Sequence, residues 1–126
     1  MNIRDYFSGV ERGLKRRGLV LERPVVSGIV DDYNGFLHFR VSFWDGSQLT
    51  VHEVVSTVRG YPEKLRYSYH FRKGSRTIFR YDNSEHHPEI PTHPHHKHHG
   101  ERIEPSSPPT LADVFAEVET QMADGR

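Results

Sequence analysis

The sequence of 126 residues contains no cysteine. Disulfide bonds, thiolate zinc sites and cysteine nucleophiles are therefore excluded, and any bound metal would need nitrogen or oxygen ligands. No apolar run approaches the roughly 20 residues that cross a bilayer, and the first residues lack the apolar stretch of a signal peptide. We therefore expect a cytoplasmic protein with no membrane partner.

Hydrophobic residues are sparse, at 34% of the chain. This content suffices for one sheet covered by a helix or two, and the length suits a single domain over residues 1–126. The 17 basic and 17 acidic side chains cancel, so net charge gives no argument for a nucleic-acid partner. The distribution of the charges does favour such a partner, because residues 59–80 hold seven basic residues and the single acid Glu63.

Hydrophobic periodicity predicts an α+β fold. Residues 2–17 have helical spacing and precede Gly18, which indicates an N-terminal helix. The period then changes to two, with turn signals at Asn34-Gly35 and Asp45-Gly46. We predict an antiparallel meander of about five strands, over residues 25–31, 36–44, 48–57, 65–72 and 77–82. A C-terminal helix follows Thr110, and both helices are expected to pack on one face of the sheet.

Residues 83–109 contain six prolines and seven histidines and little apolar periodicity. This composition predicts a long histidine- and proline-rich loop, with at most a short strand near residues 102–104. Loops of this length in a compact domain are usually either functional or disordered. Three of the prolines restrict the loop between its histidines, which favours a functional role over a solvated, inert segment.

The loop and the strand before it carry the residues best suited to chemistry. Imidazole titrates near pH 6.5, so clustered histidines supply proton donors and acceptors at cellular pH. Nearby cations can stabilise charge that develops on a phosphate. We interpret this set as a site that cleaves an RNA phosphodiester without a cofactor. The predicted catalytic residues are Arg80, Asp82, His87, His96, Lys97 and His98.

Two other interpretations remain open for the same segment. Nitrogen-rich tracts with carboxylates nearby also bind zinc, nickel or copper, so a divalent-metal nuclease is one alternative. No established ligand spacing is present, and the candidate ligands are His86, His95, His99 and Glu53. The other alternative is a non-catalytic module that binds nucleic acid or protein. For Glu53 itself, which falls in an apolar register, structural pairing with an arginine is the first expectation.

The basic strands offer a path for a nucleic-acid backbone towards the histidines. The residues predicted to form this path are Arg66, Tyr69, Arg72 and Arg76. Ordinary packing competes with this prediction, because the tyrosine shares an apolar face with its neighbours and the arginines suit a solvated face.

The motif Ile78-Phe79-Arg80-Tyr81-Asp82-Asn83, followed by His86-His87-Pro88 and Pro94-His95-His96-Lys97-His98, resembles the TumE-type toxin family of toxin-antitoxin systems. The strands upstream are also similar in size and order, so the resemblance covers most of the chain. The family pattern has a tyrosine where this chain has Phe79.

The resemblance implies a small toxin that acts on RNA or another nucleic acid and is neutralised by an antitoxin with a DNA-binding domain. It also adds Asn83 to the residues predicted to bind nucleic acid. The oligomeric state stays open, with a homodimer as one option.

Overall fold

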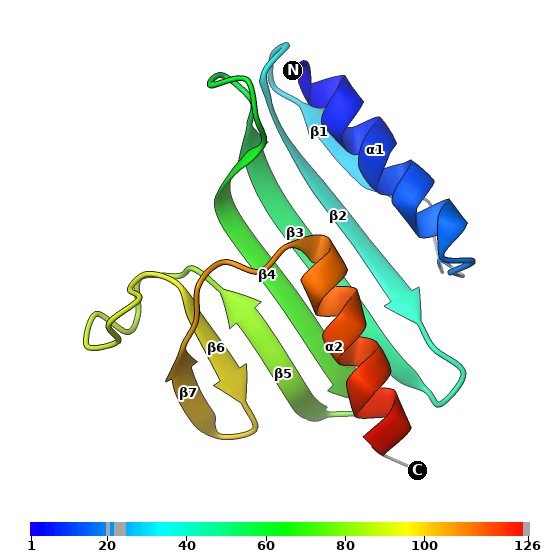
Figure 1. Ribbon diagram of the computed structural model, residues 1–126, viewed down its shortest axis with the longest axis vertical. Coiled ribbons are helices and arrows are strands. Elements are labelled where there is room, and N and C mark those ends of the chain that lie inside the picture. The colour runs from blue at the N-terminus through cyan, green and yellow to red at the C-terminus, as the bar shows by residue number, and fades with distance from the viewer. Residues whose placement is uncertain (20, 22–24, 125–126) are drawn as a thin grey trace.

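Two helices and seven strands form the part of the chain that the computed structural model describes, which is residues 1–19, 21 and 25–124 (Figure 1). In chain order the elements are α1 (Ile3–Arg16), β1 (Val26–Ile29), β2 (Asn34–Ser42), β3 (Ser47–Ser56), β4 (Glu63–Lys73), β5 (Arg76–Asp82), β6 (His96–His99), β7 (Arg102–Pro105) and α2 (Leu111–Asp124). The predicted α+β class and both predicted helices are confirmed.

The seven strands form one antiparallel sheet in which each strand pairs with its neighbour in the chain. The predicted count of about five was wrong, because β6 and β7 lie inside the segment 83–109 that we expected to be a loop. Strand β6 pairs with β5 through Asp82 opposite His96 and Phe79 opposite His99. Its sequence is His-Lys-His-His, which has no apolar alternation for a periodicity search to detect.

Side-chain caps explain where both helices begin. The backbone N–H of Arg4 donates to Asn2 Oδ1 at the start of α1, and Gly18 takes a positive φ of 65° just after its end. At α2, the N–H of Asp113 donates to Thr110 Oγ1 and the N–H of Thr110 donates to the Asp113 carboxylate. Neither helix of the described chain is long and apolar enough to span a membrane.

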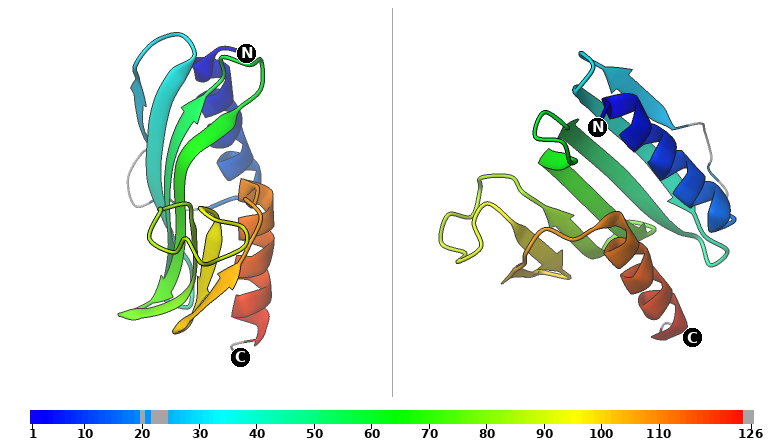
Figure 2. Two further views of the ribbon diagram at one scale, coloured as in Figure 1. Left: turned by 90° about the vertical axis from the view of Figure 1, so that its left-hand side faces the viewer. Right: turned by 45° about the horizontal axis from the view of Figure 1, so that its top comes forward.

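Both helices cover the same face of the sheet, as Figure 2 shows in the edge-on view. The buried core lies between them and that face, and it includes Leu37, Val51, Tyr69, Phe71 and Phe79. The opposite side, which no helix covers, is here called the open face. Its side chains alternate with the core residues along each strand. They include Phe36, His38, Arg40, Thr50, His52, Val54, Arg66, Ser68, His70, Arg72, Arg80, Asp82, His96 and His98.

The first hairpin differs from its prediction. Its turn lies at residues 30–33, where the Asp31 carboxylate accepts the backbone N–H groups of Tyr33 and Asn34. Asn34 and Gly35 are instead the first residues of β2. A Cβ at Gly35 would lie 2.6 Å from the Gly28 carbonyl oxygen and 3.0 Å from the Phe7 ring. Glycine is therefore needed here because the backbone of β1, and behind it the side chains of α1, approach this position closely. The predicted turn at Asp45-Gly46 is confirmed, with Gly46 at a φ of 85°.

Candidate active site

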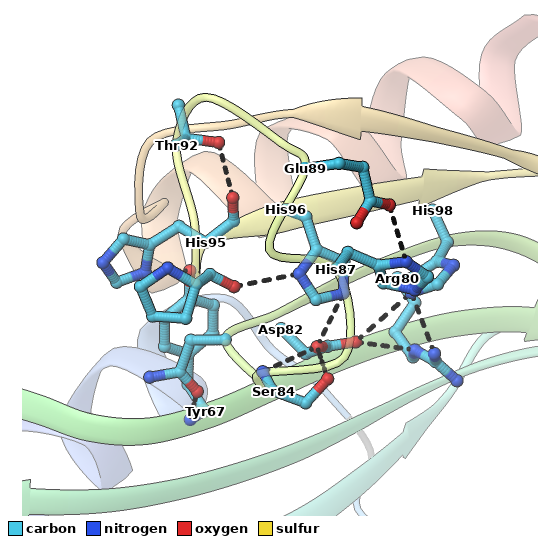
Figure 3. Close-up of polar contacts among 12 residues, drawn as sticks. Tyr67, Arg80, Asp82, Ser84, His87, Glu89, Thr92, His95, His96 and His98 are labelled. Carbon is cyan, nitrogen blue, oxygen red and sulfur yellow. Dashed lines mark hydrogen bonds and ion pairs between the residues drawn. The ribbon is translucent and has the colours of Figure 1, made fainter.

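The candidate site lies where β5 and β6 pair on the open face (Figure 3). Asp82 is opposite His96 in the strand register, and Arg80 is opposite His98. Because alternate residues of a strand share a face, all four side chains point to the same side of the sheet. The segment between the two strands returns His87 to the same place, with its ring centroid 5.1 Å from that of His96. We call His87, His96 and His98 the histidine cluster.

Asp82 is the anionic centre of the site. Its Oδ1 accepts hydrogen bonds from the Ser84 backbone N–H and hydroxyl, and its Oδ2 accepts one from Arg80 Nε at 3.0 Å. Burial alone would raise the pKa of Asp82, but the two bonds from Ser84 and the charges of His96 and Arg80 outweigh it and lower the pKa. The carboxylate is therefore ionised at neutral pH. Ser84 was not among the predicted site residues, although its spacing of two from an aspartate is typical of such local bonds.

His96 is almost completely buried and its orientation is fixed by the backbone. Its Nδ1 lies 2.9 Å from the Pro94 carbonyl oxygen, which can only accept, so Nδ1 carries a proton. Its Nε2 lies 2.9 Å from Asp82 Oδ1, but the direction is not that of a hydrogen bond and the nitrogen has no other partner. This contact is attractive only when Nε2 also carries a proton or when a cation is shared between the two groups.

His98 accepts a hydrogen bond through its ring, whereas His96 donates one to the backbone. The Nε2 of His98 lies 3.0 Å from Arg80 Nη2 and 3.6 Å from Asp82 Oδ2; a guanidinium group only donates, so the lone pair of His98 Nε2 accepts from Arg80. Burial, followed by the charge of Arg80, lowers the pKa of His98 below the ordinary value. His98 is therefore neutral at pH 7. Its ring centroid is 4.9 Å from that of His96, so the two imidazoles lie side by side.

The histidine cluster also has the composition of a metal centre. One nitrogen from each of His87, His96 and His98 lies within 4.8 Å of the others. Zinc binds imidazole nitrogens at about 2.0–2.1 Å and commonly uses three histidines plus a water in catalytic sites. The Pro94 carbonyl holds His96 by its other nitrogen, as carbonyls often hold a ligating histidine. Small side-chain movements would be needed to bring the three nitrogens around one ion.

Lys97 lies apart from the histidines with which the sequence analysis grouped it. It alternates with His96 and His98 along β6 and so points to the helix-covered side, where its Nζ lies 2.8 Å from Glu117 Oε2 of α2. Burial, which acts in the other direction, is outweighed by the bonds to Glu117 and Tyr81, and the pKa of Lys97 is raised. The lysine thus joins α2 to the sheet.

The four residues considered as metal ligands do not meet in the structure. His86 is exposed, and His95 stacks on Tyr67 with its Nδ1 3.0 Å from the phenol oxygen. His99 lies at the far end of β6 beside Arg102. Glu53 is buried in the core. Among the residues that the structure describes, the group that could hold a metal ion is instead the histidine cluster.

Glu53 is paired with tyrosines and not with the arginine that we expected. The hydroxyls of Tyr6 in α1 and Tyr69 in β4 both donate to its carboxylate. Burial, followed by the charge of Glu53, raises the pKa of both phenols. Lys64 Nζ lies 2.7 Å from the Tyr69 hydroxyl and also donates to the Pro109 carbonyl, just before α2. These residues form a polar network, and Tyr6, Glu53 and Lys64 line a pocket of about 720 Å³ between the helices.

The residues predicted to bind nucleic acid are divided between surface and interior. Arg66 and Arg76 are exposed, and Arg72 donates a hydrogen bond to Gln48. Tyr69 is fully buried, so it has no surface to offer a ligand. Asn83 is also buried, and its side chain accepts from the Tyr67 N–H and donates to the Leu65 carbonyl. The asparagine therefore completes the hydrogen bonding of β4 where β5 ends.

A comparison with protein families supplies the identification. The model of the family described as Toxin TumE matches residues 12–124 of the chain. The chain belongs to the TumE toxin family. This confirms the resemblance found in the sequence motif and makes the protein the toxin of a toxin-antitoxin system, with a cognate antitoxin as its partner. No curated protein and no solved structure matches the chain.

Proposed function

We propose that this TumE-family toxin cleaves RNA at the histidine cluster by general acid–base catalysis. The observation that carries the proposal is the pairing of two imidazoles with opposite roles. His98 presents a neutral Nε2 that accepts, and His96 presents a buried Nε2 that lies 2.9 Å from the Asp82 carboxylate and has no hydrogen-bond partner. An acid and a base side by side are what transesterification of a phosphodiester requires.

In the proposed reaction, His98 takes the proton of the ribose 2′-hydroxyl as the 2′-oxygen bonds to phosphorus. The bond from phosphorus to the 5′-oxygen breaks, and His96 gives its Nε2 proton to that leaving oxygen. The products are a 2′,3′-cyclic phosphate and a free 5′-hydroxyl. Arg80 stabilises the charge on the phosphate oxygens, and the arriving phosphate draws the guanidinium away from His98 Nε2.

A metal-dependent cleavage is a second candidate, because three histidine nitrogens converge and His96 Nε2 has no hydrogen-bond partner. A metal held by the histidine cluster would supply an activated water or polarise the phosphate. Arg80 disfavours this version, since its guanidinium lies 3.0 Å from one of the three histidines and would repel a cation there.

Purified toxin incubated with labelled RNA and labelled DNA, with and without a chelator, tests the proposal. We expect the toxin to cleave RNA and not DNA, because DNA lacks the attacking 2′-hydroxyl, and the chelator to have no effect. Loss of cleavage with chelator and its return with added Zn²⁺ would replace the acid–base version by the metal version. Intact RNA under all conditions would overturn both.

The pH dependence of cleavage should report the pKa of the general base, His98. Because the pKa of His98 is lowered, kcat/KM is expected to fall only when the pH drops below the ordinary histidine value of about 6.5. Arg80→Gln removes one of the charges that lower this pKa, so the acidic limb should move to higher pH as the overall rate falls. Arg102→Gln, at an exposed arginine, is the control. An acidic limb that Arg80→Gln leaves in place would contradict the role given to His98.

A further inference from the structure

Two rows of paired residues cross the open face and end in the candidate site. The first row, from β2 to β6, is His38, His52, Ser68, Asp82 and His96. The second row is Arg40, Thr50, His70, Arg80 and His98. Neighbouring strands lie about 4.8 Å apart, so each row extends roughly 19 Å from β2 to β6. The β2 end of each row is thus separated from the histidine cluster by the length of several nucleotides, and the surface between them is continuous.

The far end of the first row offers flat apolar surfaces. Phe36 is 45% exposed, and its ring lies across Gly28 of β1, where a Cβ would be 2.1 Å from the ring. The rings of His38 and His52 stack with centroids 4.1 Å apart. Burial, followed by the charge of His38, lowers the pKa of His52, so this imidazole is neutral at pH 7. Exposed Val54 completes the apolar surface.

These side chains line a hollow that also has cations at its edge. The hollow has a volume of about 390 Å³ and includes Phe36, His52 and Arg66 among its lining residues. Within residues 1–19, 21 and 25–124, Arg40, Arg66 and Arg72 have no carboxylate at ion-pair distance. Asp82 is the one acid in the two rows, and Arg80 already pairs with it. The surface therefore combines unpaired positive charge with exposed aromatic faces.

We propose that a single-stranded nucleic acid binds across the open face, along these two rows. An unpaired base stacks on Phe36 and the His38–His52 pair, while Arg40 and Arg66 hold the backbone. A phosphate further along the strand then reaches Arg80. A duplex does not fit this surface as well, because its bases are stacked on each other and their faces cannot stack on aromatic side chains. This inference deepens the proposed function, on which it rests for the position of the reacting phosphate.

Fluorescence anisotropy with a labelled single-stranded DNA of about 12 nucleotides measures this binding, since the toxin is expected not to cleave DNA. Phe36→Ala should weaken binding about 5- to 150-fold, the range for loss of one base–aromatic stack, and Phe36→Trp should retain it. Arg40→Gln should reduce the slope of log affinity against log salt by about 0.7. Tyr61→Ala and Arg16→Gln, at residues away from the rows, are matched controls, and thermal melts check folding.

The outcomes separate this inference from the proposed function. Unchanged binding by Phe36→Ala, or a labelled duplex that binds as tightly as the single strand, would overturn the inference even if RNA cleavage persists. Single-strand binding that depends on Phe36 and Arg40, without any RNA cleavage by the wild-type toxin, would uphold the surface and overturn the catalytic proposal. A labelled single-stranded RNA of the same sequence, tested with a His96→Ala/His98→Ala variant that is expected not to cleave it, shows which sugar the surface prefers.

Discussion

Replacing His96 and His98 together by alanine is expected to lower RNA cleavage by at least about 10³-fold and to abolish growth arrest. Each general acid or base contributes about 10²- to 10⁴-fold, and two groups that act in one step do not add independently. Either single variant should therefore lose nearly as much activity as the double variant. The measurements are initial rates with labelled RNA and colony counts after induction of the toxin.

His99→Ala is the matched control for this experiment. His99 is on the same strand but on the other side of the sheet from His96 and His98. The double variant should keep a cooperative thermal transition, at a temperature lowered by the cavity that buried His96 leaves, because Asp82 retains its bonds from Ser84 and Arg80. Full activity in the double variant would eliminate acid–base catalysis by these residues. An equal loss in His99→Ala would show that the effect comes from disruption of β6.

The double variant Tyr6→Phe/Tyr69→Phe is expected to lower the free energy of unfolding by about 3–5 kcal/mol. Both hydroxyls donate to the buried Glu53 carboxylate, so their removal leaves that group in the core without these donors. Each single variant should cost about 1.5–3 kcal/mol, which is the usual value of a hydrogen bond to a charged group. Urea unfolding followed by circular dichroism measures these differences.

A third change to the same network provides the decisive control. Adding Glu53→Met to the double variant should recover most of the lost stability, because replacing both partners of a buried polar contact by apolar groups is often nearly neutral. If the triple variant is as unstable as the double variant, the loss comes from altered packing of the rings and not from an unpaired carboxylate. RNA cleavage measured at a temperature where all variants are folded should change little, since this network lies on the helix-covered side of the sheet.

The helices and the first five strands were predictable because their apolar residues repeat with the period of each element. Leu37, Phe39 and Val41 alternate along β2, and the cap at Thr110 is visible in the sequence. Strands β6 and β7 were not predictable in this way. Their stability comes from pairing with β5 and with each other, and side chains such as those of His96 and His98 give no apolar pattern.

The same error explains the misplaced lysine. In a loop, Lys97 can point in the same direction as its neighbours, but in a strand it must point away from them. Recognition of β6 would have separated Lys97 from His96 and His98 and would have paired those two with Asp82 and Arg80. The tyrosine partners of Glu53 could not be predicted from the sequence for a different reason. Tyr6 is 47 residues away in the chain, and only the packing of α1 on the sheet brings it there.

The opposite placement of the core and the histidine cluster has a consequence for how such a toxin can diversify. Strands β5 and β6 each send packing side chains such as Phe79 to one side and reactive ones such as Arg80 to the other. Substitutions on the reactive side therefore remove few of the apolar contacts that maintain the fold. Toxins of this fold could therefore exchange residues on the open face during evolution without compensating substitutions in the core.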